Sequence, residues 1–142
     1  MKRMTLLYID DDAEDREFFQ EALKEIDPSV LCCMAKDGAE GLRVLNELVM
    51  LPDFIFVDVN MPVMGGKQFL IEVKRHDTFS LIPVIIYSTT NYPAELREYE
   101  LLGAHRVLMK PASMKSIIQL VKSVIYETEP DRESADSILT GG

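Results

Sequence analysis

Five polar residues with side chains suited to metal or phosphate chemistry each follow a short apolar run in this sequence. Asp10 and Asp11 follow the first run, Asp58 follows another, and Ser88 and Lys110 end two more. Three carboxylates brought together would raise the pKa of at least one of them unless a cation joined them. Mg²⁺ suits such a group, because it prefers oxygen ligands and usually binds carboxylates together with phosphate oxygens. With a lysine and a hydroxyl at the same point, this set predicts magnesium-assisted phosphoryl transfer.

The apolar runs alternate with helical patterns five times along the chain. The runs are short, rich in Val, Ile, Leu and aromatic residues, and bounded by acids, Pro or Gly, which predicts strands buried on both faces. These strands cover 4–9, 30–35, 54–59, 84–88 and 105–109. The predicted helices cover 13–26, about 39–50, about 65–75, 93–103 and about 113–126. We therefore predict an α/β fold, doubly wound around a five-stranded parallel sheet.

This topology would gather the polar residues at one edge of the sheet. In open parallel sheets the ligand site lies beyond the carboxyl ends of the strands, where all five polar residues fall. Asp12 is placed to cap the first helix, and Gly103 to end the fourth. In the first two predicted helices, the apolar residues recur at a spacing that places them on one face, toward the sheet. They are Phe18, Phe19, Ala22, Leu23 and Ile26 in the first helix, and Leu42, Leu45, Leu48 and Val49 in the second.

Length, charge and composition narrow the classes of protein. The 142 residues fit one domain, which we place at 1–127, followed by a flexible polar tail at 128–142. The net charge of −9 disfavours nucleic-acid binding, which depends on clustered Lys and Arg. No run is long enough for a signal peptide or a membrane span, so we expect a cytoplasmic protein. The adjacent Cys32 and Cys33 are expected to pack in the interior.

Four motifs in this order resemble the receiver domain of two-component response regulators. The resemblance covers residues 4 to about 127 and implies the flavodoxin-like (βα)5 fold with strand order 2-1-3-4-5. We expect a stand-alone receiver, because nothing after residue 127 could form an output domain. The motifs are the acid pair at 10–11, FVDVNMPVMGG at 56–66, IPVIIYST at 82–89 and VLMKP at 107–111.

The resemblance assigns a role to each polar residue of the acidic cluster. Asp58 matches the aspartate that accepts a phosphoryl group from a phosphohistidine. Asp11 matches the direct ligand of Mg²⁺, and Asp10 matches the acid that usually reaches the metal through water. The backbone carbonyl of Asn60 matches the third protein ligand. The implied cofactor is therefore Mg²⁺, held by Asp10, Asp11, Asp58 and Asn60.

The resemblance also assigns the residues that contact the phosphoryl group. Ser88 matches the switch hydroxyl, and Lys110 matches the lysine that pairs with the phosphoryl oxygens. The bond to the following proline, here Pro111, is usually cis in the family. Val107 departs from the pattern, since this position is often Tyr or Phe.

The resemblance implies protein partners and no substrate turnover beyond the protein's own phosphorylation and dephosphorylation. The expected phosphodonor is a sensor histidine kinase or a histidine phosphotransfer protein, and the output is a downstream protein target. The last helix has a wide apolar arc. Its extra residues are either stray surface residues or part of a partner or homodimer surface with the fourth helix and fifth strand.

Two other functions remain as alternatives. One is a degenerate receiver that binds partners without phosphorylation, against which the complete set of site residues counts. The other is a small magnesium-dependent phosphatase of the haloacid dehalogenase type, which also forms an aspartyl phosphate. That family places a second acid two residues after the nucleophile, where this sequence has Asn60.

Overall fold

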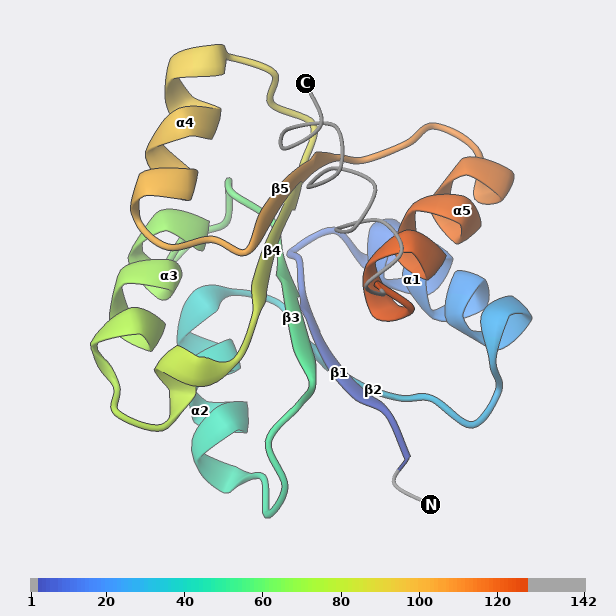
Figure 1. The fold of residues 1–142 in the computed structure, drawn as a ribbon, viewed down its shortest axis with the longest axis horizontal. Coiled ribbons are helices and arrows are strands. Elements are labelled where there is room, and N and C mark those ends of the chain that lie inside the picture. Colours follow the sequence, from blue (N-terminus) through green and yellow to red (C-terminus); the bar gives the residue numbers. More distant parts are fainter. Residues whose placement is uncertain (1–2, 128–142) are drawn as a thin grey trace, which may run out of the picture.

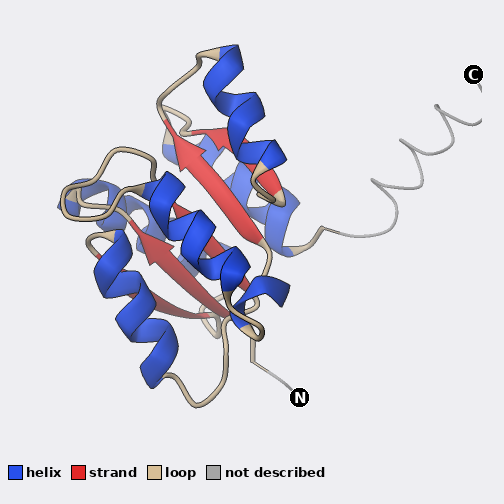
Figure 2. Ribbon diagram, turned by 90° about the vertical axis from the view of Figure 1, so that its left-hand side faces the viewer, coloured by secondary structure: helices blue, strands red, loops and turns tan. Residues whose placement is uncertain are grey.

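A single parallel sheet of five strands forms the centre of the molecule. The computed structural model describes residues 3–127. The strands lie in the order β2-β1-β3-β4-β5, and Figure 2 shows them running in the same direction between helices. The predicted sheet and its strand order are confirmed. The strands are β1 (Thr5–Ile9), β2 (Leu31–Ala35), β3 (Phe54–Val57), β4 (Val84–Ser88) and β5 (Arg106–Met109).

Helices cover both faces of the sheet. Figure 1 shows α2, α3 and α4 on one side of the sheet, and α1 and α5 on the other. A short 3-10 helix, η1 (Phe79–Leu81), follows α3 and was not predicted. None of the described helices combines the length and apolar character that crossing a bilayer requires. Within residues 3–127 the α-helices are α1 (Ala13–Ile26), α2 (Gly38–Glu47), α3 (Gly66–Arg75), α4 (Pro93–Leu101) and α5 (Met114–Ile125).

The alternating side chains of the strands divide the core into two apolar clusters. In β1, Leu7 and Ile9 face the α2, α3 and α4 side, whereas Leu6 and Tyr8 face α1 and α5. All four side chains are fully or almost fully buried. A strand that buries both faces has no solvent-facing side, which is why these runs are almost entirely apolar.

The strand register brings the carboxyl ends of the strands to one edge. Ile9 pairs with Ala35 on one side and with Val57 on the other. Ser88 pairs with Met109 at the end of β4. The residues that follow these positions therefore emerge together, as predicted from the element order.

Two predicted inward positions are wrong. Phe18 was placed on the buried stripe of α1, but its side chain is 44% exposed, and its neighbour Phe19 takes the core position at 1%. Adjacent helical residues differ by about 100° in direction, and here Phe19 points into the sheet while Phe18 lies at the margin of the buried stripe. α2 ends at Glu47 rather than near 50, which leaves Val49 99% exposed.

The cysteines pack as predicted, whereas the apolar arc of the last helix is not made of stray surface residues. Cys32 and Cys33 are free thiols that pack against opposite clusters, and burial raises the pKa of Cys32 to about 12. In α5, Ile118 and Leu120 are half-buried against the α1 side of the core, so the wide apolar arc packs inside the domain. Its role as a partner surface stays a prediction. The predicted tail at 128–142 lies outside the described residues.

Candidate functional site

Asp10 is a fully buried carboxylate held by three donors. It directly follows β1, and its backbone N–H donates to the carbonyl of Ala35 over 3.0 Å. Its Oδ2 accepts from the hydroxyl of Tyr8 at 2.8 Å and from the ammonium of Lys110 at 2.6 Å. Its Oδ1 accepts from the backbone N–H of Asp12 at 3.0 Å. A buried carboxylate is costly unless it is paired and hydrogen-bonded, and these three donors supply both.

The next two acids have separate roles. Asp12 caps α1, because its Oδ1 accepts from the backbone N–H groups of Glu14 and Asp15 at 2.9 and 3.3 Å. This confirms the predicted cap, which satisfies donors that have no partner within the helix. Asp11 is exposed and belongs to the acidic cluster instead.

Asp58 completes the acidic cluster from β3. Its backbone N–H donates to the carbonyl of Ile9 over 2.9 Å, which places it beside Asp10. Carboxylate oxygens of Asp10, Asp11 and Asp58 all lie within 4.8 Å of one another. The three predicted carboxylate ligands are therefore brought together, at a spacing that one divalent cation could bridge.

The environment of Asp58 disfavours its charge. Burial raises the pKa of its carboxyl, and the positive charge of Lys110 lowers it, while the negative charge of Asp10 raises it further. The backbone N–H of Val59 and the hydroxyl of Ser88 favour the ionised form. The net pKa of Asp58 is nevertheless raised above its ordinary value.

The turn after β3 fixes the backbone of Asp58 against α3. The backbone N–H of Gly66 donates to the carbonyl of Val59 over 2.9 Å. Gly66 lies so close that a methyl group there would collide with the carbonyl oxygen of Asp58. Val63 adopts a left-handed backbone conformation with φ of 66°. Asn60, in the same turn, is exposed, and metal binding through its carbonyl stays a prediction.

Ser88 lies at the end of β4, directly beside Asp58. Its side chain is buried, and its hydroxyl lies near enough to Asp58 to lower the pKa of that carboxyl. The backbone N–H of Thr90 approaches the same hydroxyl at 3.4 Å. The backbone carbonyl of Ser88 accepts from the N–H of Lys110 at 2.9 Å, which links the ends of β4 and β5.

Lys110 lies between three acids, one of which the sequence did not suggest. Its Nζ is 2.6 Å from Asp10, 2.8 Å from Asp15 and 3.7 Å from Asp58. Although burial alone lowers the pKa of this ammonium, its hydrogen bonds to Asp10 and Asp15 raise the pKa overall. The only sequence signal for Asp15 was its place in the first turn of a helix that starts beside the acid pair.

The Lys110–Pro111 bond differs from what the resemblance implied, and the structure shows where Val107 lies. The bond between Lys110 and Pro111 is trans, since the described residues contain no cis peptide bond, so the expected cis bond is wrong. Trans is the lower-energy form of a bond to proline by roughly 0.5–1 kcal/mol. Val107 packs half-buried against the cluster on the α2, α3 and α4 side.

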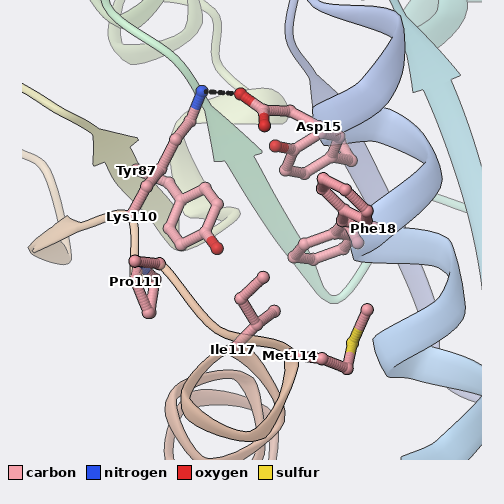
Figure 3. Close-up of a pocket in the computed structure, with 10 residues that line it drawn as sticks. Asp15, Phe18, Tyr87, Lys110, Pro111, Met114 and Ile117 are labelled. Carbon is pink, nitrogen blue, oxygen red and sulfur yellow. Dashed lines mark hydrogen bonds and ion pairs between the residues drawn. The ribbon is translucent and has the colours of Figure 1, made fainter.

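A pocket of about 280 Å³ opens on the α1 side of Lys110. Figure 3 shows Lys110 joined to Asp15 at one end of this pocket, with Phe18, Tyr87, Met114 and Ile117 around it. The ring centroid of Tyr87 lies 6.0 Å from the Lys110 ammonium. Lys110 thus separates the acidic cluster from an apolar pocket between α1 and α5.

Comparisons with known proteins agree on one family. The family model of the response regulator receiver domain matches residues 6–122. The chain is 33% identical over 121 residues to the sensor histidine kinase CheAY of Helicobacter pylori, covering 84% of this chain and 15% of the kinase. It is 26% identical to the response regulator Rcp1 of Synechocystis, covering 84% of each. The crystal structure of the phosphorylated cyanobacterial phytochrome response regulator RcpA aligns with a TM-score of 0.80 at 25% identity, over 87% of this chain and 91% of that one.

Proposed function

The chain belongs to the response regulator receiver domain family of two-component signalling, and from this premise we propose that Asp58 accepts a phosphoryl group from a phosphohistidine. The observation that carries the proposal is the set of groups facing Asp58. Burial raises the pKa of its carboxyl, the ammonium of Lys110 lies 3.7 Å away, and the hydroxyl of Ser88 favours the ionised carboxylate. Perturbed acids of this kind are enriched at functional sites.

Mg²⁺ is the proposed cofactor, and the acidic cluster fits it. Opposite ligands of Mg²⁺ lie roughly 4.2 Å apart, because each Mg–O bond is about 2.1 Å long. The three carboxylates offer oxygens within 4.8 Å of one another. Asp11 is exposed and suited to direct ligation, whereas both oxygens of Asp10 already accept hydrogen bonds, which suits contact through water. The carbonyl of Asn60 is the fourth proposed protein ligand.

The chemistry would require little beyond positioning and charge. A carboxylate oxygen of Asp58 attacks the phosphorus, the P–N bond to the donor histidine breaks, and its electron pair stays on the imidazole nitrogen. Lys110 and Ser88 stabilise the phosphoryl oxygens by an ion pair and a hydrogen bond. When bound, Mg²⁺ supplies further neutralisation of the negative charge that gathers on the cluster and the phosphoryl group.

The proposed output is a change in protein binding. The donor would be a sensor histidine kinase or a histidine phosphotransfer protein, and the phosphorylated form would bind a downstream protein target. The surface of α4, β5 and α5 is a candidate for the target or for a second copy of the chain. Leu101 at 81% and Met109 at 50% are the large apolar side chains exposed there.

Intact mass spectrometry tests the phosphoacceptor. The parent protein and Asp58→Asn are each incubated with Mg²⁺ and acetyl phosphate, which transfers its phosphoryl group and releases acetate. We expect one added phosphate on the parent, lost in base and kept in acid, and none on the variant. Equal labelling of both proteins would overturn the role of Asp58.

A thermal melt tests the metal site independently. Mg²⁺ that binds the folded protein raises Tm by mass action, and relief of charge repulsion in the cluster contributes to that binding. We expect a higher Tm in millimolar Mg²⁺ than in EDTA for the parent, and a smaller rise for Asp11→Asn. An unchanged Tm for the parent would count against metal binding.

A further inference from the structure

The ammonium of Lys110 is hydrogen-bonded to Asp10 and Asp15 and not to Asp58. Its distances to their carboxylates are 2.6 and 2.8 Å, whereas the 3.7 Å to Asp58 is beyond hydrogen-bond length. Figure 3 shows the contact with Asp15 at the end of the pocket between α1 and α5. The lysine therefore makes its hydrogen bonds with Asp10 and Asp15, and its contact with Asp58 is a longer ion pair.

The two acids that hold Lys110 differ in how firmly they are fixed. Asp10 is fully buried and also accepts from Tyr8 and from the backbone of Asp12, so its position is set by several contacts. Asp15 has a side chain that is 33% exposed, and water can replace its contact with the lysine. Lys110 can therefore break its contact with Asp15 more easily than its contact with Asp10.

Asp15 also lies outside the proposed metal cluster. The carboxylates that approach one another within 4.8 Å are those of Asp10, Asp11 and Asp58. A cation bound there would weaken the attraction of Lys110 to Asp10 and Asp58 and would leave Asp15 as its partner. The capped first turn of α1 keeps Asp15 in place, since its backbone N–H donates to Asp12.

We infer that Asp15 is a positioning residue that holds Lys110 away from Asp58 and competes with the phosphoryl group for its ammonium. The inference rests on the proposed phosphorylation of Asp58. A phosphoryl group carries up to two negative charges, so it attracts the lysine more strongly than one carboxylate does. Part of that attraction is offset by the loss of the Asp15 contact, and Asp15 thereby slows phosphorylation and shortens the lifetime of the phosphorylated state.

The test compares charge removal at Asp15 with charge removal one residue earlier. Asp15→Asn keeps the size of the side chain and removes its charge. Glu14→Gln removes a charge from the same helical turn, and Glu14 is not among the acids that pair with Lys110. Asp15→Glu restores the charge and serves as the conservative rescue. Each protein is phosphorylated with acetyl phosphate and Mg²⁺, and its affinity for Mg²⁺ alone is measured separately.

For Asp15→Asn we expect an initial phosphorylation rate about fivefold above the parent and a longer-lived acyl phosphate, which is the size expected for one partly exposed ion pair. Glu14→Gln and Asp15→Glu should stay within about twofold of the parent. The Mg²⁺ affinity of Asp15→Asn should match that of Glu14→Gln, which a general change in the cluster's charge would not produce.

Two outcomes would overturn the inference while leaving the proposed function intact. In the first, the parent is labelled on Asp58 and Asp15→Asn behaves as Glu14→Gln does. In the second, Asp15→Asn is phosphorylated more slowly than the parent, which would mean that Asp15 places Lys110 for the reaction. A parent protein that takes no phosphate on Asp58 would overturn both.

Discussion

The two faces of the sheet support the same site in different ways. On the α1 and α5 side, four aromatic rings pack together: Tyr8 lies 4.1 Å from Phe19 between ring centroids, and Phe56 and Tyr87 lie within 6.1 Å of their neighbours. The α2, α3 and α4 side is mainly aliphatic and brings glycines into close contact with other elements. The α1 and α5 side is thus packed by large aromatic side chains, whereas the α2, α3 and α4 side depends on glycines that let elements approach closely.

The difference decides how each face reaches the functional residues. The α1 and α5 side contacts the acidic cluster and Lys110 through aromatic side chains. The hydroxyl of Tyr8 donates a hydrogen bond to Asp10, and the ring of Tyr87 lies beside the ammonium of Lys110. The aliphatic side acts through the main chain, because Gly66 packs on the carbonyl of Asp58. Substitutions on the two faces should therefore damage the protein by different mechanisms.

The largest effect is expected at the centre of the aromatic face. Phe19→Ala removes a ring that is 1% exposed and should lower the free energy of unfolding by about 3–5 kcal/mol. Phe18→Ala, at the neighbouring position with 44% exposure, should cost less than about 1 kcal/mol. Urea titration measures both. Similar losses for the two variants would show that the aromatic cluster does not dominate this face.

The next largest loss of stability is expected on the α2, α3 and α4 side, at the glycine that packs against the backbone of Asp58. Gly66→Ala places a methyl group against the carbonyl of Asp58 and should cost about 1–3 kcal/mol, with weaker labelling by acetyl phosphate. The methyl group of Gly41→Ala instead meets side chains, Ile9 at 2.5 Å and Phe69 at 3.1 Å, and should cost less because the end of Ile9 can shift where backbone cannot. If Gly41→Ala proved more damaging, close backbone contact would not be the property that supports Asp58.

Two buried tyrosine hydroxyls, one on each face, provide a finer comparison. Tyr8→Phe removes a 2.8 Å bond to the buried Asp10 and should cost about 1.5–3 kcal/mol. Tyr99→Phe removes a 3.4 Å bond to Glu95 and should cost less than about 1 kcal/mol. Thermal melts in EDTA compare them. Equal losses would argue against a special role for the aromatic face in holding Asp10.

The smallest effect is a gain in stability at Asp58. Because the folded-state pKa of this acid lies above its ordinary 3.8, its ionisation lowers the free energy of unfolding at every pH above the folded pKa. That loss disappears below about pH 3.8, where the carboxyl is protonated in both states. In EDTA, Asp58→Asn should therefore be more stable than the parent at pH 7, and the difference should shrink as pH falls. A variant that is less stable at pH 7 would contradict the raised pKa.

Much of the site could be predicted because strand ends are encoded locally. The apolar runs end at Ile9, Val57 and Ser88, so the polar residues after them had to emerge at one edge of a parallel sheet. The cap at Asp12 was also predictable, since it depends only on the residue type before a helical pattern. The exposure of Phe18 was not, because its apolar residue type and its spacing placed it on the same stripe as Phe19.

The sequence by itself determined the order of the elements and the edge of the sheet at which Asp10, Asp11, Asp58, Ser88 and Lys110 emerge. Periodicity and residue type carry that information along the chain. Only the tertiary structure decided that Lys110 pairs with Asp15, because the contact joins residues 95 positions apart and depends on how α1 rotates against the sheet. The same packing decided that Tyr8 supports Asp10 from within the aromatic cluster and that Lys110 hydrogen-bonds to Asp10 and Asp15 rather than to Asp58.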